Sequence, residues 1–293
     1  MKIYNLGSLN IDYVYSVEHF VGAGETLASQ NMQIFAGGKG LNQSVALSRA
    51  GSVVVHGAIL GRDGEFLKQT LSDNGVDTER VELVESSSGH AIIQVDKNGQ
   101  NSILLYGGTN KVIDREYIER FLCDAKENDI LVLQNEISNL SVAFEIAKER
   151  KMQIAFNPSP FDETIHNLPL KFVKWWFCNE TEGEALFGSA NPDEIAERFI
   201  REYPDSNLIL TLGEKGCIFK NADTFIRQSI YETNVIDTTA AGDTFTGYFI
   251  SAISQGKNID CALKLASKAA SVTVSRRGAS PSIPYINELT TDN

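Results

Sequence analysis

The regular alternation of short apolar runs with helical patterns is the feature that most restricts the fold of this chain of 293 residues. Runs rich in apolar, β-branched and aromatic residues are separated by segments with helical periodicity along most of the sequence. This order is typical of parallel strands joined by crossover helices. The expected buried strands are residues 3–7, 53–58, 130–134, 154–157, 175–179 and 208–212. We therefore expect an α/β fold with a mostly parallel sheet covered by helices.

A helix start is predicted at Asn191, which is followed by Pro192 and Glu194. Asparagine is a preferred N-cap, and proline fits the first helical position. A glutamate three residues after the cap is the usual partner in a capping box. We expect this helix to bury Ile195 and Phe199 against the sheet.

Two segments, residues 11–34 and 89–106, do not fit the alternation. The second is expected to be a hairpin, because Asn98-Gly99 is a strong signal for a tight turn between strands. We expect both segments to form a small β-sheet that stands off the main one and acts as a lid or a dimer surface. No repeat or linker divides the sequence further, so residues 1–293 are predicted to be a single α/β domain with this β lid.

Composition narrows the possible partners and the location. The chain has 26 Lys and Arg against 38 Asp and Glu, a formal charge of −12, which disfavours binding to nucleic acids or anionic membranes. It lacks a signal peptide and an 18-residue apolar run, so the cytoplasm is the expected compartment. The cysteines are far apart and are expected to be buried thiols, not zinc ligands or disulfides. They are Cys123, Cys178, Cys217 and Cys261.

The segment 237–247 contains the most informative motif. The small residues Ala240, Ala241 and Gly242 lead directly into a helical pattern. Exposed N–H groups at a helix start, together with the helix dipole, suit a phosphate or a phosphoryl group in transfer. Asp243 would lie in the first helical turn, placed to accept a proton from a hydroxyl that attacks the phosphoryl group. The alternative is an ordinary acidic residue at a helix start.

A second glycine-rich segment, residues 36–43, also opens a helix. It does not match the phosphate-binding loop of common nucleotide hydrolases, and no dinucleotide-binding fingerprint follows a strand. The glycines would let a small polar ligand approach closely, with Lys39 and Asn42 as donors. A plain structural turn with a solvated lysine is the alternative.

Polar side chains follow several predicted strands, at the sheet edge where doubly wound folds bind ligands. Asn10 and Asp12 follow the first strand and suit sugar hydroxyls, and Glu136 follows the strand 130–134. The alternatives are turn capping and loop solvation.

Two further strands end in candidate nucleotide-binding residues. Asn179 and Glu182 are placed to hold a hydrated Mg²⁺, or form a simple acidic helix start. The turn at 211–216 suits a loop around a nucleotide, or is a hairpin turn.

Residues 37–43 and 237–245 together resemble the two signatures of the ribokinase family of carbohydrate kinases (the pfkB-type group), and the similarity runs from about Ile3 to about Tyr285. The resemblance implies transfer of the ATP γ-phosphate to a sugar hydroxymethyl group. It makes Asp243 the base and the amides of Ala240 to Asp243 the anion hole. It also implies a doubly wound α/β domain whose small β-sheet lid often forms a homodimer.

The resemblance assigns further roles residue by residue. The implied sugar pocket is Asn10, Asp12, Gly38, Lys39, Asn42, Glu136 and Asp243. The implied nucleotide contacts are Asn179, Thr211, Gly213, Gly216, Gly242 and Ser267. Asn179 and Glu182 match an N-x-x-E motif that influences Mg²⁺ and phosphate binding. The positions for an activating monovalent cation, usually K⁺, are Asp237, Thr239, Thr273, Arg276, Gly278 and Ser282, several through backbone carbonyls.

Ribose is the substrate that the resemblance favours, with another furanose, a keto-sugar or a nucleoside as alternatives. The sequence departs from the family pattern at Thr246, Asn135, His90 and Gln94. His90 and Gln94 lie in the expected lid, so they bear on which sugar is bound. A catalytically silent sugar or nucleotide sensor on the same fold is the alternative from another class. A nicotinamide-dependent oxidoreductase would need the missing glycine fingerprint.

Overall fold

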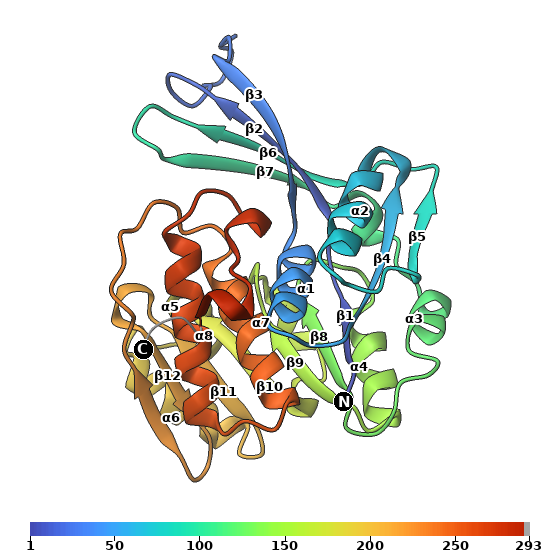
Figure 1. Cartoon of the computed structure of the whole chain (residues 1–293), viewed down its shortest axis with the longest axis vertical. Helices are drawn as coiled ribbons and strands as arrows, with labels where there is room; N and C mark the ends of the chain where they lie inside the picture. The colour runs from blue at the N-terminus through green and yellow to red at the C-terminus, as the bar shows by residue number, and fades with distance from the viewer. Residues whose placement is uncertain (290–293) are drawn as a thin grey trace.

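The computed structural model describes residues 1–289 and contains two separate sheets (Figure 1). The larger sheet has nine strands in the order β13-β12-β11-β10-β9-β8-β1-β4-β5. Its strands are β1 (Ile3–Leu6), β4 (Val54–Gly61), β5 (Val81–Val84), β8 (Ile130–Gln134), β9 (Gln153–Asn157), β10 (Val173–Asn179), β11 (Asn207–Thr211), β12 (Cys217–Lys220) and β13 (Phe225–Gln228). All neighbours from β11 to β5 pair in parallel, and β12 and β13 are added by antiparallel pairing.

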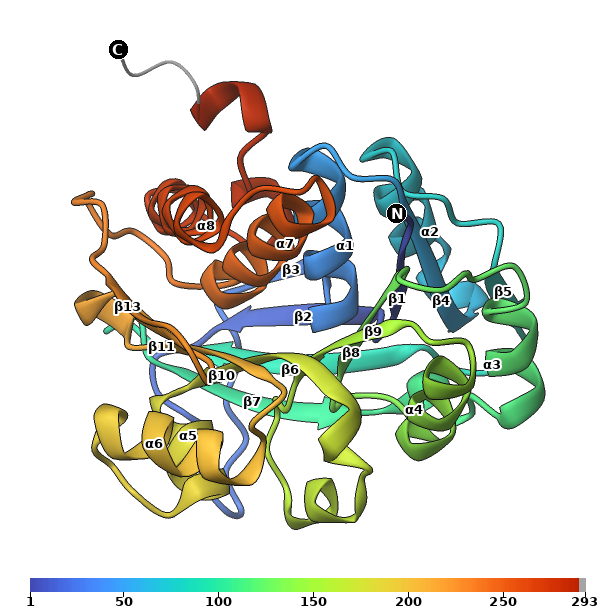
Figure 2. The same cartoon turned by 90° about the horizontal axis from the view of Figure 1, so that it is seen from below.

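Helices cover both faces of this sheet (Figure 2). On one face lie α1 (Lys39–Arg49), α2 (Glu65–Asp73), α7 (Ala241–Ser254) and α8 (Ile259–Val274). On the other lie α3 (Arg115–Phe121), α4 (Leu140–Glu149), α5 (Glu180–Phe187) and α6 (Pro192–Glu202). Short 3₁₀ helices lie at Arg62–Gly64, Gly108–Lys111, Glu163–Asn167, Leu170–Phe172, Gly213–Lys215, Ser280–Ser282 and Ile286–Leu289.

Alternate residues of the central strands supply two hydrophobic cores. Ile3 and Val132 pack on the α7 side, and their chain neighbours Tyr4 and Leu131 pack on the α4 side. A parallel sheet that is covered on both faces needs such continuous apolar strands. The chain passes from β1 to β4 on one side and later to β8 on the other. A switch point therefore lies between the carboxyl ends of β1 and β8, where open α/β sheets bind ligands.

The smaller sheet has the order β3-β2-β6-β7 and projects from the body of the molecule (Figure 1). Its strands are β2 (Asn10–Ser16), β3 (Asn31–Gly37), β6 (Gly89–Val95) and β7 (Asn101–Tyr106). The predicted hairpin turn is present, with Gly99 at a φ of 77° and Asp96 N–H donating to Gln100 O at 3.0 Å. The first insertion extends beyond the predicted limit of residue 34, because β3 continues to Gly37 directly before α1.

The expected α/β class with a mostly parallel sheet, flanking helices and a small β-sheet is confirmed. All six predicted strands are present within a few residues, as β1, β4, β8, β9, β10 and β11. The predicted domain limit of 293 extends past the described residues, which end at 289. Within residues 1–289, every helix is too short or too polar to cross a membrane.

Two local predictions are wrong in part. Asn191 caps α6 as expected, accepting from Asp193 N–H at 2.9 Å, but Glu194 is not its capping-box partner. The Ser189 hydroxyl accepts from Asn191 N–H (3.2 Å) in place of the Glu194 carboxylate, and it donates to that carboxylate (2.7 Å).

The cysteine prediction holds only for Cys178 and Cys217, which are buried. Cys123 and Cys261 are exposed. Both lie outside the apolar runs that form the strands: Cys123 follows the end of α3, and Cys261 lies in the first turn of α8.

Candidate active site

The start of α7 forms the centre of the site. Its N-cap, Ala240, has a left-handed φ of 61°, a strained conformation for alanine that often marks functional backbone. Ala241 N–H donates to Thr238 O at 3.3 Å and Thr244 N–H to Ala240 O at 2.8 Å. The N–H groups of Gly242 and Asp243 lie between them, where a helix supplies no acceptor one turn before. A side chain at Gly242 would meet open space. This arrangement suits an anion.

Asp243 is almost fully buried, and α1 holds its carboxylate from one side. Asn42 Nδ2 donates to Asp243 Oδ2 at 3.1 Å, and Gln43 Nε2 donates to Asp243 Oδ1 at 2.9 Å. Each oxygen keeps a second lone pair for a proton or a hydroxyl. Asp243 is thus an acidic residue in the first turn of α7, as the alternative expected, but it is buried and held by two side-chain donors. Gln43 was not among the predicted site residues.

Lys39 and Glu136 meet beside this carboxylate. Glu136 accepts from the backbone N–H of Lys39 at 3.1 Å and from the Ser8 hydroxyl. Burial raises the pKa of Glu136 above its usual value, and Lys39 offsets this only in part. Burial acts to lower the pKa of Lys39, but the carboxylates of Asp243, Glu136 and Glu182 raise it overall. The Lys39 side chain therefore keeps its positive charge near these carboxylates, and it lines a cavity of the site.

Asn10 and Asp12 lie within β2 of the smaller sheet, so the alternative that they cap a turn is wrong. Burial, and then the nearby Glu136 carboxylate, raise the pKa of Asp12 to about 7. Gly37 on the paired strand leaves room for this side chain, since a Cβ there would collide with the Asp12 carboxylate. Asn110 Nδ2 donates to Asn10 Oδ1 at 2.8 Å, which leaves the Asn10 amide nitrogen as the free donor.

Asn110 was also missed by the sequence analysis. It is buried, and its Oδ1 accepts from Leu9 N–H at 3.1 Å, so it joins the base of the smaller sheet to the end of β1. The one feature of the sequence that could have indicated Asn110 is its position shortly after the predicted hairpin 89–106.

Asn179 and Glu182 form a capping box at the start of α5. Asn179 Oδ1 accepts from Glu182 N–H at 2.9 Å, and Glu182 Oε2 accepts from Asn179 N–H at 3.0 Å. The alternative prediction, a simple acidic helix start, therefore describes these two residues correctly. Both residues also line a cavity of about 240 Å³ with Lys39, Asp243 and Thr246, next to the start of α7.

No group of three or more acidic, His or Cys side chains within residues 1–289 is placed to hold a metal ion. A divalent ion at Asn179 and Glu182 would thus rely on water and phosphate oxygens, as Mg²⁺ often does.

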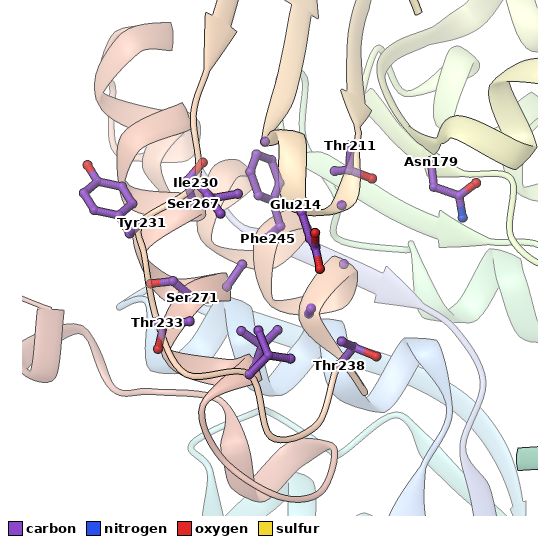
Figure 3. A pocket seen from close by; sticks show the side chains of 17 residues that line it. Asn179, Thr211, Glu214, Ile230, Tyr231, Thr233, Thr238, Phe245, Ser267 and Ser271 are labelled. Carbon is purple, nitrogen blue, oxygen red and sulfur yellow. The ribbon is translucent and has the colours of Figure 1, made fainter. Parts of the chain in front are cut away.

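A second cavity, of about 420 Å³, adjoins the first and shares Asn179, Thr211 and Gly242 with it. Figure 3 shows its lining, with Tyr231 and Ser267 on one side and Thr211 and Asn179 on the other. All residues predicted to contact a nucleotide line it: Asn179, Thr211, Gly213, Gly216, Gly242 and Ser267. Its mostly apolar lining suits a nucleoside whose phosphates point to α7.

The turn at residues 211–216 joins the antiparallel strands β11 and β12, so the hairpin alternative is correct, and the turn lines the cavity as well. Gly216 has a φ of 87°, and a Cβ there would collide with Gln228 O, so only glycine fits.

The residues predicted for a monovalent cation lie in two neighbouring loops that Asp237 joins. Asp237 Oδ1 accepts from the N–H and hydroxyl of Thr239 at 2.9 and 2.6 Å, and its Oδ2 accepts from Gly278 N–H at 2.9 Å. Burial acts to raise the pKa of Asp237, but these bonds lower it overall, so it stays ionised.

The remaining cation candidates, Thr273, Arg276 and Ser282, follow in and after the end of α8. The Arg276 guanidinium pairs with Glu288 at 2.6 Å, and the Ser282 hydroxyl donates to Ala279 O at 2.7 Å. The Asp237 carboxylate is a hard oxygen donor, the kind of ligand that an alkali cation takes.

The departures from the family pattern in the smaller sheet point away from Asp12. Asp12 pairs with Ala91, so His90 and Gln94 lie on the opposite face. There the His90 ring contacts the rings of Tyr13 and Tyr106, with centroids 5.9 and 4.9 Å apart.

Asn135 also has a structural contact, since its amide donates to Pro160 O at 2.8 Å. Of the four departures, Thr246 is the one that lines a site cavity.

The chain is similar to known proteins along nearly its whole length. The profile of the pfkB family of carbohydrate kinases matches residues 2–286. A ribokinase of Haemophilus influenzae is 35% identical over 97% of this chain and 95% of its own length. A deoxyribokinase of Salmonella typhi is 32% identical over 99% and 97%. The structure of Arabidopsis thaliana ribokinase complexed with ribose and ATP superimposes with a TM-score of 0.88 at 28% identity, covering 100% of this chain and 99% of that one.

Proposed function

Because the chain belongs to the pfkB family of carbohydrate kinases, we propose that it transfers the γ-phosphate of ATP to the hydroxymethyl group of D-ribose, giving D-ribose 5-phosphate and ADP. The observation that carries this proposal is the position of Asp243. Asp243 lies in the first turn of α7, where it accepts a hydrogen bond from Asn42, a residue of the proposed sugar pocket. It also lines the smaller cavity, and its neighbour Gly242 lines both that cavity and the proposed nucleotide cavity.

Phosphoryl transfer needs positioning and charge stabilisation more than covalent help from the protein. In the proposal, the hydroxymethyl oxygen attacks the γ-phosphorus while Asp243 accepts its proton, and ADP leaves. The N–H groups at the start of α7, from Ala240 to Asp243, and the Lys39 cation stabilise the phosphoryl oxygens. Thr211, Gly213, Gly216 and Ser267 contact the nucleotide.

Sugar recognition is assigned to residues from both sheets. Asp12 and Glu136 accept hydrogen bonds from ribose hydroxyls, and the amide nitrogen of Asn10 donates one. Gly38 allows close approach, since its φ of 97° places the backbone where a side chain would collide with Ser8 O. Asn42 Oδ1 is buried without a hydrogen-bond partner within residues 1–289, so a sugar hydroxyl that reached it would supply the missing bond.

Two cations belong to the proposal. Mg²⁺, which neutralises phosphate charge when bound, would be held through water by Asn179 and Glu182. K⁺ would be held by Asp237 and by carbonyls from the loops that contain Thr239, Thr273, Arg276, Gly278 and Ser282. Loss of turnover on replacing K⁺ with a bulky organic cation, with Mg²⁺ present, would support that part.

The smaller sheet is proposed to close over the sugar as a lid and to pair with a second copy in a homodimer. Its last strand is exposed along its whole length, including Ile103, Leu104 and Leu105. Large exposed apolar patches of this kind mark protein interfaces. The single-domain organisation and the cytoplasmic location remain predictions from the sequence.

The test is an ADP-release assay with Mg-ATP and K⁺ against ribose, deoxyribose, fructose, tagatose and common nucleosides. Ribose is expected to give the highest kcat/KM. A higher value with deoxyribose would keep the kinase and overturn ribose as its substrate. Sugar binding by calorimetry without ADP release would favour the silent sensor.

A further inference from the structure

Gln43 is a fully buried polar residue that contacts the proposed base and lines neither site cavity. We propose that Gln43 is a positioning residue for catalysis: it holds the Asp243 carboxylate in one orientation and is itself held by a chain of buried amides. This inference rests on the proposed function, in which Asp243 accepts the proton.

The chain begins at Asn5 in β1. Asn5 Nδ2 donates to Gly40 O at 2.9 Å and to Ser44 Oγ at 2.8 Å. Because a backbone carbonyl only accepts, the amide nitrogen of Asn5 must face Gly40. Its oxygen therefore faces Gln134 of β8.

The orientation of Asn5 then fixes the next two amides. Gln134 Nε2 donates to Asn5 Oδ1 at 3.0 Å and to Gln43 Oε1 at 2.7 Å. Gln134 keeps this orientation although its own Oε1 has no hydrogen-bond partner within residues 1–289. With Gln43 Oε1 turned to Gln134, the amide nitrogen of Gln43 must face Asp243, to which it donates at 2.9 Å.

The three amide side chains are fully buried, so water does not replace a lost partner easily. They connect β1 and β8, the strands at the switch point, to the first turn of α7 through α1. With one oxygen of Asp243 fixed by Gln43 and the other by Asn42, the carboxylate cannot rotate freely. A small misplacement of a catalytic group is enough to reduce turnover strongly.

The test begins with Gln43→Met, which keeps the length of the side chain and removes the amide. We expect kcat with ribose to fall about 10- to 100-fold. KM for ribose and for ATP should stay within about twofold, because Gln43 lines neither cavity. Gln153→Met is the matched control: Gln153 accepts from Trp175 Nε1 at 2.9 Å at the opposite end of the sheet, so its loss should leave kcat unchanged.

Combining Gln43→Met with Asp243→Asn tests whether Gln43 acts by positioning Asp243 or has a general structural role. If Gln43 acts through Asp243, adding Gln43→Met to Asp243→Asn should lower kcat by no more than about twofold, since residues that act as a unit are not additive. The same fold-loss in both backgrounds, or full kcat in the single Gln43 variant, would overturn the inference. Near-normal turnover of Asp243→Asn alone would instead remove Asp243 as the base, the part of the proposed function on which this inference rests.

Gln134→Met is the second variant in case Gln43→Met does not fold. It removes the donor that holds Gln43 Oε1, so Gln43 can shift while its nitrogen still faces Asp243, and we expect a loss of kcat in the same direction but smaller. Thermal unfolding of each variant identifies those that fold. An unchanged kcat in a folded Gln134→Met would show that the amide chain does not orient Gln43, and would overturn that part.

Discussion

The two sheets differ in how deeply they bury the residues of the candidate site. Strands β1, β4 and β8 of the larger sheet are buried along their whole length, and the groups around Asp243 are fixed by hydrogen bonds from several elements. The smaller sheet carries Asp12 on a half-buried strand, and its outer strand β7 is exposed throughout. The difference indicates a division of work. In the proposed function, the buried core positions the phosphoryl chemistry, and the less covered sheet supplies part of the sugar pocket.

The sharpest way to break this division is Asp243→Asn. We expect kcat to fall by about 10² or more through loss of general-base help. Binding of ribose and ATP should stay nearly intact, because the amide keeps the shape of the carboxylate. Steady-state kinetics and calorimetry measure the two effects separately. Near-normal turnover would remove Asp243 from the mechanism.

On the smaller sheet the prediction is the reverse, a binding effect. Asp12→Ala should raise the ribose KM about 10- to 100-fold, the range for lost hydrogen bonds to a charged group. The ATP KM should change little, since Asp12 lines neither the nucleotide cavity nor the start of α7. Kinetics with each substrate varied in turn checks this. Equal changes in both values would place Asp12 outside the sugar pocket.

A pH profile sharpens the same point. The pKa of Asp12 is raised to about 7, so its carboxyl becomes protonated as the pH falls through 7 and accepts hydrogen bonds less well. We expect kcat/KM for ribose to fall as pH is lowered from 8 to 6, by at most about tenfold per unit below the pKa. In Asp12→Asn this limb of the profile should disappear. Its persistence there would assign the titration to another group.

The smallest expected effect on turnover comes from the outer face of the smaller sheet. Leu104→Glu, at a side chain 69% exposed, should convert a dimer to a monomer in light scattering while kcat changes little. Ala222→Glu, in the exposed turn between β12 and β13 of the larger sheet, is the matched control for added charge. A wild-type mass for both variants, or a monomeric wild type, would contradict pairing through this sheet.

The sequence predicted the features that depend on local pattern. Continuous apolar runs gave the central strands, and Asn98-Gly99 gave the hairpin turn. The edge strands β5 and β13, and β12 next to β13, were missed, because a strand of four residues is too short to show a clear periodicity. The cap at Asn191 followed from its residue type, but the part of Ser189 in it depends on the path of the preceding loop.

The site was predicted where residues lie within a motif and missed where distant side chains meet. Glycine-rich signatures marked Lys39, Asn42 and Asp243. The chain from Asn5 through Gln134 to Gln43 joins residues up to 129 positions apart, and no local pattern marks such a contact. The same holds for Asn110, which is 100 positions from Asn10.

The most direct test of the account is ³¹P NMR of the product formed from ribose and Mg-ATP in the presence of K⁺. The account predicts one phosphomonoester, on the hydroxymethyl oxygen of ribose, formed together with ADP and almost absent with Asp243→Asn. A phosphate on another ribose hydroxyl, or ATP left intact by the wild-type protein, would contradict it.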